Sequence, residues 1–424
     1  MMLRLTTLVI NPPVLVNRAA LAVLLALTGC VSMTPKSETS SNSPPPTEDA
    51  PVASSSSLAK LQVNSELLQQ SWEVYRQQFI QADGRVIDYE ASDRSTSEGQ
   101  AYAMLRAVLI NDPATFATTL NWAENNLRRR SAAGEPLDQL WAWKWGIDQA
   151  GNWGTIDENF ASDADIDCIT ALILASRRWG RPEYLDLALK KLRDLWQFST
   201  IEGQEGKNYL LPGPASAFVL PEGKIYLNPS YFAPYAFRLF AQVDPDHDWL
   251  SLVESSYQVL NNSSQIAATG LPSDWIALDL NTGQIKPLPS DSKIQSLYSF
   301  DAYRVWWRVA WDAVWFDSRE ARSYLQTASQ HLQQLWHSSS RLPARIDLKG
   351  QATVSYDATS QYAMLYAAWR LIEPDKAQQL LDQKLLPRYN QGIWDDQSAY
   401  YTQNLVWLAL LPPTEIEPQL LQPQ

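Results

Sequence analysis

Most of the chain carries apolar side chains at helical spacing. Between residues 58 and 411, apolar residues recur at i, i+3 and i+4 in successive stretches, which is the pattern of an amphipathic helix. The predicted helices cover residues 58–80, 100–110, 113–129, 165–179, 182–198, 229–243, 249–262, 302–316, 318–336, 359–372 and 399–411. The pattern predicts an all-α fold of eleven or twelve helices, at about 30 residues for each helix with its loop.

Strand patterns are few. Residues 274–288 alternate on both sides of Asn281-Thr282-Gly283 and predict a β-hairpin. Residues 209–229 are rich in Pro and Gly and predict an irregular excursion between helices. Regularly paired helices in this number favour a closed ring of helical hairpins, an α/α toroid with small β-hairpin excursions. An open stack of helix pairs is the structural alternative.

The first 29 residues read as an export signal. Arg4 and Arg18 precede the apolar run AALAVLLALTGC, which is too short to cross a bilayer as a helix. The end of that run resembles a bacterial lipobox, which implies cleavage before Cys30 and acylation of this residue. Two or more acyl chains anchor a protein stably. We therefore expect an exported, membrane-anchored lipoprotein on the periplasmic or cell-surface side, with an ordinary signal peptide as the alternative.

A polar segment follows. Residues 31–57 hold nine Ser and five Pro and cannot form a core. A chain of this kind lets the remainder range on the order of 30 Å from its anchor. The expected organisation is a signal peptide at 1–29, the lipidated cysteine and disordered tether at 30–57, one helical domain at 58–413 and a C-terminal tail at 414–424.

Composition excludes several classes of function. The 424 residues carry a net charge of -12, and no basic run is interleaved with aromatics, so a nucleic-acid surface is not expected. The only cysteines are Cys30 and Cys168, and the three histidines lie too far apart for a His/Cys metal site. The nucleotide and serine-hydrolase motifs GxGxxG, GxxxxGK and GxSxG are missing. We expect no cofactor and, from the acidic surface, a monomer.

Glu98 stands at the start of a predicted helix. With Ser95 it has the spacing of a capping box, in which both side chains satisfy backbone amides. That explanation leaves Gly99 unexplained, because glycine inside a helix costs about 1 kcal/mol relative to alanine. A glycine here fits a position where chain or substrate approaches the backbone closely.

Two further helix starts carry acids. Asp163, Asp165 and Asp167 open one helix, where carboxylates complement the helix dipole. Asp301 precedes another helix and has Arg304 three residues on, the spacing of an ion pair. Each has a simple structural explanation when taken alone.

Together these acids predict a site. In a ring of helical hairpins the inner helices run in one direction, so carboxylates at their starts gather in one cleft. Aromatic residues crowd near these acids in the sequence: Trp141, Trp143, Trp145, Trp153, Tyr231 and Trp275. Flat rings stack on sugar faces and acids transfer protons. The pattern predicts a polysaccharide site.

Six sequence blocks carry a family resemblance. SEGQAYAMLRAVL, LWAWKWG, ASDADIDCITALILA, NPSYFAPYAFRLF, GLPSDW and YSFDAYRVWWR follow in this order over about 210 residues. They resemble glycoside hydrolase family 8, the bacterial endoglucanases that include the enzyme encoded with cellulose synthase. The resemblance implies an (α/α)6 barrel that hydrolyses β-1,4 links with inversion. It also implies a β-glucan substrate and an association with the cellulose synthesis machinery.

The resemblance assigns roles to the residues of these blocks. It implies Glu98 as the general acid, Asp163 as the active-site aspartate and Asp301 as the general base, whose position varies among subgroups. Glu98 then needs a raised pKa, from burial and from the charge of Asp163. It implies Tyr231 as a hydrogen-bonding partner beside the nucleophilic water. The other expected substrate-binding residues are Trp145, Trp141, Trp143, Arg304 and Trp275.

One departure and several alternatives remain. Cys168-Ile169 stands where relatives commonly have Ile-Ala, and we expect both positions to pack in the barrel wall. The same family contains chitosanases, xylanases and mixed-linkage glucanases. A membrane-tethered polysaccharide-binding protein without catalysis, and an unrelated α/α toroid such as an epimerase or a lyase, are the other readings.

Overall fold

The computed structural model describes residues 65–131 and 133–422. The predicted signal peptide, Cys30 and the predicted tether at 30–57 lie outside the described residues. Within the described part, no helix has both the length and the apolar character needed to cross a membrane.

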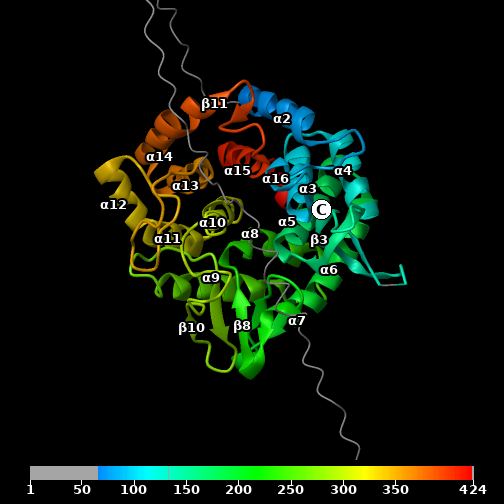
Figure 1. The fold of residues 1–424 in the computed structure, drawn as a ribbon, viewed down its shortest axis with the longest axis horizontal. Coiled ribbons are helices and arrows are strands. Elements are labelled where there is room, and N and C mark those ends of the chain that lie inside the picture. The colour runs from blue at the N-terminus through cyan, green and yellow to red at the C-terminus, as the bar shows by residue number, and fades with distance from the viewer. Residues whose placement is uncertain (1–64, 132, 423–424) are drawn as a thin grey trace, which may run out of the picture.

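Six helices form the inner wall of a barrel (Figure 1). They are α3 (Ser97–Leu109), α5 (Ser162–Trp179), α8 (Pro234–Val243), α10 (Arg304–Trp315), α13 (Thr359–Ile372) and α15 (Tyr400–Leu410). Each packs against the next, and α15 packs against α3. The predicted closed toroid, an (α/α)6 barrel, is therefore confirmed and the open stack is not formed.

Each inner helix has an outer partner. The pairs with the outer helices are α3 with α4 (Pro113–Asn126), α5 with α6 (Pro182–Ser199), α8 with α9 (Trp249–Ser264), α10 with α11 (Arg319–Ala328), α13 with α14 (Pro374–Leu380) and α15 with α2 (Ser65–Phe79). The first described helix thus pairs with the last long one, and the two ends of the chain close the ring. The predicted helix at 318–336 is divided at Ser329 into α11 and α12 (Gln330–Ser339).

The inner helices are buried on all sides, as their sequences require. In α3 every residue except Glu98 is buried, and in α15 every residue except Thr402. Apolar residues all round a helix mark one enclosed by other helices. Cys168 and Ile169 are both fully buried in α5, which confirms their expected place in the barrel wall.

A four-stranded sheet that the helical pattern did not reveal lies beside the barrel. β3 (Pro136–Ile147) pairs with β1 (Ser95–Thr96), β2 (Arg128–Arg130) and β4 (Trp153–Phe160). The turn between β3 and β4 is built by Asp148, whose side chain accepts from the N–H groups of Ala150 and Asn152. Irregularities in the β3–β4 register break the alternation that would identify a strand.

The predicted hairpin belongs to a second sheet. β9 (Ile276–Asp279) pairs with β10 (Ile285–Lys286), which confirms the prediction for residues 274–288. The irregular excursion contains the short helix α7 (Ala215–Phe218) and adds the strands β7 (Val219–Leu220) and β8 (Lys224–Leu227) to this sheet. Two short hairpins complete the strands: β5 (Thr200–Glu202) with β6 (Asn208–Leu210), and β11 (Tyr389–Asn390) with β12 (Ile393–Trp394).

The C-terminal segment packs against the barrel. A 3-10 turn at Pro413–Glu415 contacts α10, and α16 (Pro418–Leu421) contacts α5. Arg177 donates to the Leu420 carbonyl at 2.8 Å, and Gln242 donates to the Leu421 carbonyl at 3.1 Å. Arg177 and Gln242 lie in the last turns of α5 and α8, so this segment covers the end of the barrel at which the inner helices finish.

Candidate active site

The opposite end of the barrel holds an open cavity, and its empty space of about 450 Å³ includes the solvent at its mouth. Its lining residues are Arg94, Thr96, Ser97, Glu98, Trp143, Ala161, Asp163, Tyr231, Asp301, Arg304 and Tyr400. Several of them are first-turn residues of α3, α5, α10 and α15. The prediction that inner helix starts gather the acids at one end is confirmed.

Glu98 takes no part in capping its own helix. The cap of α3 is Thr96, whose Oγ1 accepts from the Gly99 N–H at 3.0 Å. The Ser95 hydroxyl donates instead to the Val86 carbonyl at 2.6 Å. The capping-box interpretation is therefore wrong, and the Glu98 carboxyl turns into the cavity.

The environment of Glu98 favours its protonated form. Tyr400 donates to Oε1 at 2.9 Å, and Arg304 donates to Oε2. Burial raises the pKa of Glu98 to about 7, with a further contribution from the charge of Asp163. The charge of Arg304 and the Tyr400 hydrogen bond oppose this rise without cancelling it. Glu98 can therefore carry a proton near neutral pH, as a general acid requires.

Packing within the chain does not require a glycine at position 99. A Cβ atom there would lie 3.4 Å from the Thr96 Oγ1, the Tyr400 ring and Val86, which is an ordinary contact distance. The described residues therefore do not form the expected close approach to the Gly99 backbone.

The three aspartates of α5 separate by helical rotation. At about 100° per residue, Asp163 and Asp167 share a face and Asp165 lies on the opposite one. Asp163 accepts from Arg304 at 2.9 Å, and one turn further on Asp167 forms a bidentate pair with Arg308 at 2.8 Å. Burial raises the pKa of Asp163, and the charges of Arg304 and Arg308 oppose the rise.

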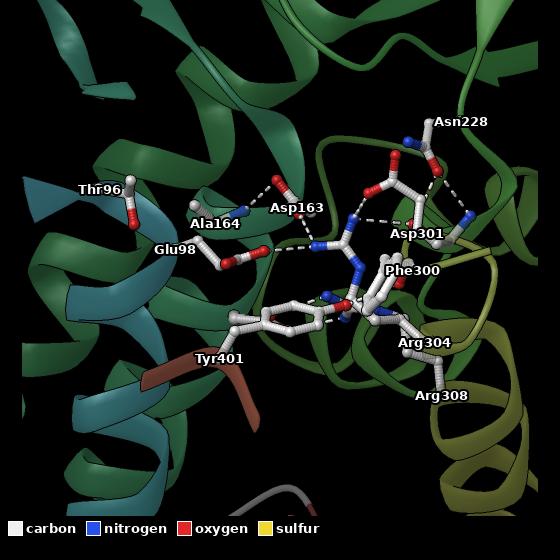
Figure 2. Close-up of polar contacts among 12 residues, drawn as sticks. Thr96, Glu98, Asp163, Ala164, Asn228, Phe300, Asp301, Arg304, Arg308 and Tyr401 are labelled. Carbon is white, nitrogen blue, oxygen red and sulfur yellow. Dashed lines mark hydrogen bonds and ion pairs between the residues drawn. The ribbon is translucent and has the colours of Figure 1, made fainter. Parts of the chain in front are cut away.

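Arg304 joins the acids (Figure 2). Its side chain is 3% exposed. Nη1 binds Glu98 and Asp163, and Nη2 donates to Asp301 at 2.8 Å and to the Ser230 Oγ at 3.0 Å. The predicted pair between Asp301 and Arg304 is confirmed, but it is one part of a larger network.

The turn that carries Asp301 is held by a residue that the sequence did not single out. Asp274 accepts from the N–H groups of Ser299 and Ala302, at 3.1 and 2.8 Å, and from the Ser299 hydroxyl. Burial and the nearby charge of Asp301 raise the pKa of Asp274 to about 7. Asp274 belongs to the same GLPSDW block as Trp275, and no local pattern distinguishes a buried turn-binding aspartate from an exposed one.

Tyr231 and Trp275 lie at different depths. Tyr231 lines the cavity, and the Arg304 guanidinium lies 5.3 Å from its ring centre. Trp275 is buried, stacks on Phe218 with 5.9 Å between ring centres, and lies behind Tyr231. Trp275 therefore supports the wall of the cavity, and its predicted contact with substrate is not formed by this geometry.

The β1–β3 register places Trp145 away from the cavity. Paired residues share a face, and successive residues alternate. Ser95 pairs with Trp145 and Thr96 with Lys144. Because Thr96 lines the cavity, Trp145 lies on the other face. There it stacks on Trp153 with 5.1 Å between ring centres.

The sequence had placed Trp145 first among the stacking rings, and the structure changes that order. Trp141 is fully buried, and its Nε1 donates to Glu124 at 2.8 Å. The Lys191 ammonium lies 4.3 Å from the Trp141 ring centre, which leaves no face for a ligand. Regular alternation would put Trp143 on the same face as Trp145, but the β3–β4 register shifts in this stretch, and of the three predicted rings Trp143 is the one that lines the cavity.

Fold and site together define a class of protein. A closed α/α barrel that gathers a glutamate of raised pKa, two aspartates, a buried arginine and aromatic rings at one end is an architecture suited to acid–base chemistry on sugar chains. The comparison with known families agrees. The profile of glycosyl hydrolases family 8 matches residues 50–411, and the chain belongs to that family.

Similar proteins point the same way. The chain is 36% identical over 246 residues to an endoglucanase of Xanthomonas axonopodis pv. citri (strain 306), covering 57% of this chain and 60% of that protein. It is 30% identical over 251 residues to an endoglucanase of Escherichia coli (strain K12), covering 59% and 64%. The chain thus spans about three fifths of the length of these curated relatives.

Solved structures share the fold. An endo-1,4-D-glucanase from Vibrio fischeri ES114 superposes with a TM-score of 0.67 at 27% identity, covering 80% of this chain and 93% of that one. A cold-adapted family 8 xylanase gives a TM-score of 0.65 at 19% identity, with 82% and 91% covered, and shows likeness of fold alone.

Proposed function

We propose that this protein is an inverting endo-β-1,4-glucanase acting on cellulose-type chains, with Glu98 as general acid and Asp301 as general base. One observation carries the proposal. A buried carboxyl whose pKa is raised to about 7 faces the same arginine as a second carboxylate, Asp301, whose side chain is 24% exposed. Family membership and relatives named as endoglucanases support the reaction and the polymer class.

In the proposed reaction Glu98 is the proton donor and Asp301 is the proton acceptor. Glu98 gives its proton to the glycosidic oxygen, while Asp301 takes a proton from water that attacks the anomeric carbon from the opposite face. Inversion needs roughly 6.5–9.5 Å between the two carboxyls to admit that water. Arg304 supports this separation, because Glu98 binds its Nη1 and Asp301 binds its Nη2.

The neighbouring residues receive supporting roles. Asp163 hydrogen-bonds the sugar at the cleavage point, and Tyr231 helps to orient the water. Trp143 stacks on the sugar chain, a role for which its place on the cavity wall makes it the best candidate among the three tryptophans of the block.

The decisive experiment measures reducing-end release from carboxymethyl-cellulose by the protein and by Glu98→Gln. We expect activity in the wild type alone, with oligosaccharide binding retained by the variant. Proton NMR of early product should show the α-anomer. Near-normal turnover by Glu98→Gln, or early β-anomer, would reject the assignment. If neither protein releases reducing ends from this polymer, the same assay is repeated with chitosan, xylan and mixed-linkage glucan.

We further propose that Cys30 is acylated and holds a monomeric enzyme at the exported side of a membrane, where it acts beside the cellulose synthesis machinery. The lipobox-like sequence supports the anchor. Metabolic labelling with a radioactive fatty acid should mark the wild type and leave Cys30→Ser unmarked. Equal labelling of both would reject the anchor.

A further inference from the structure

Asn228 presents a buried side-chain donor that has no partner among the described residues. It is 1% exposed and lies directly before the 3-10 turn Pro229–Tyr231. Its Oδ1 accepts from the Ser230 N–H at 3.0 Å and from the Ser230 hydroxyl at 2.7 Å. A backbone N–H can only donate, so the orientation of the amide is fixed. Its Nδ2 is buried and finds no partner among the described residues.

The donor and acceptor roles of the hydrogen bonds around Asn228 can be assigned. Arg304 can only donate, and its Nη2 donates to the Ser230 Oγ at 3.0 Å, so the Ser230 hydroxyl proton points to Asn228. The same Nη2 donates to the Asp301 Oδ1 at 2.8 Å. Asn228 is therefore linked to the proposed base through one serine and one arginine, and its free end is a donor.

Asp301 offers the matching acceptor. Within the described part of the chain, hydrogen bonds reach its carboxylate at Oδ1 alone. Figure 2 shows the Asn228 amide on the side of the Asp301 carboxylate away from Arg304. Buried amide donors in folded proteins almost always have a partner, and capping the short turn uses only the oxygen of this side chain.

We propose that Asn228 is a positioning residue for the general base: in the working enzyme its Nδ2 donates to the Asp301 Oδ2, a bond that the unliganded structure does not form, so that Arg304 and Asn228 hold the carboxylate from both sides. The inference rests on the proposed function, since it requires Asp301 to be the base. Donors on both oxygens favour the ionised carboxylate and stop its rotation. One lone pair of Oδ2 then remains aimed at the water whose proton it accepts.

The test uses Asn228→Ser and Asn228→Asp. Both substitutes keep an oxygen that can cap the turn, and both remove the amide donor. We expect kcat to fall about tenfold or more, KM to change by less than about twofold, and the acidic limb of the kcat/KM profile to move to higher pH. Asn126→Ser on α4, whose amide donates to the Trp122 carbonyl, is the control and should leave all three unchanged.

Each outcome decides the question. Wild-type kcat and an unmoved acidic limb in a folded Asn228→Ser protein would overturn the inference. If that variant fails to fold, Asn228→Asp has the original size and decides in its place. Asp301→Asn, assayed in parallel, distinguishes a failure of the proposed base from a failure of the role proposed for Asn228. Turnover by Asp301→Asn rejects the proposed base and the inference with it, whereas an inactive Asp301→Asn beside a fully active Asn228→Ser rejects the inference alone.

Discussion

Asp165 is an acid that the site does not use. It is fully buried behind β3, where Oδ1 accepts from the Trp141 N–H at 3.3 Å and Oδ2 has no partner among the described residues. The nearby Lys191 ammonium binds Glu124 at 3.0 Å. Burial raises the pKa of Asp165 to about 8, against the opposing charge of Lys191. The folded protein therefore holds this carboxyl in its neutral form.

This burial makes stability depend on pH. The folded-state pKa lies above the ordinary aspartate pKa of 3.8, so the folded state binds more protons, and stability present at low pH is lost as the pH rises through about 8. Asp165→Asn keeps the shape without the ionisation. We expect the variant to lose less thermal stability than the wild type between pH 5 and pH 9, measured by calorimetry. Parallel curves for the two proteins would contradict the assignment.

Glu98 should set the alkaline limb of activity. Its acid form gives the proton, and its pKa is raised to about 7, so kcat/KM should fall as the pH rises through that region. The measurement is a kcat/KM profile on a soluble oligosaccharide between pH 5 and pH 9. Activity that stays constant up to pH 9 would exclude Glu98 as the acid.

At the scale of elements, strand β3 divides its tryptophans between two environments. Trp143 lines the cavity, and Trp145 packs on the other face with Trp153 and with Trp122, whose ring centre lies 5.3 Å away. The Arg85 guanidinium lies 4.6 Å from the Trp145 ring centre and is tied to Ser95 at 2.8 Å on the same face. The two rings should therefore respond differently to the same substitution.

Trp143→Ala should weaken oligosaccharide binding about three- to tenfold, because it removes a stacking surface, and should also lower the free energy of unfolding, because Trp143 is 7% exposed. Trp145→Ala should lower the free energy of unfolding by roughly 2–4 kcal/mol and leave affinity near the wild-type value, because it opens a packed cluster. Calorimetric titration and urea unfolding measure the two effects. Weaker oligosaccharide binding by Trp145→Ala than by Trp143→Ala would show that the assignment of the two rings to the cavity and to the packed cluster is wrong.

The helices were predictable from the local spacing of apolar residues, but the sheet that contains β3 was not. A helix is recognised from apolar residues three and four positions apart, which depend on the segment alone. The face of a strand residue depends on its pairing partner, and a shift of one residue reverses every side chain. The register irregularities in β3 therefore hid both the strand and the orientation of its rings.

For the whole molecule, the C-terminal segment and α2 complete the barrel. Leu420 in α16 is 1% exposed against the end of the barrel remote from the cavity. Leu420→Ala should lower the free energy of unfolding by about 2 kcal/mol or more and leave KM unchanged. Gln419→Ala, at the exposed neighbouring position, is the matched control. If Leu420→Ala changed KM and left urea unfolding unchanged, the conclusion that this end of the barrel serves stability and not substrate binding would be wrong.

The sequence by itself determined the ring of helices and the gathering of Glu98, Asp163 and Asp301 at its inner helix starts. Helical periodicity is local, and parallel inner helices bring their first turns to one end whatever the loops do. Only the tertiary structure decided that Arg304 joins the three acids, that Trp143 faces the cavity in place of Trp145, and that the Asn228 amide ends the network with a donor that has no partner among the described residues. These contacts join segments up to 206 residues apart, as between Arg304 and Glu98, and depend on register and packing that no single segment encodes.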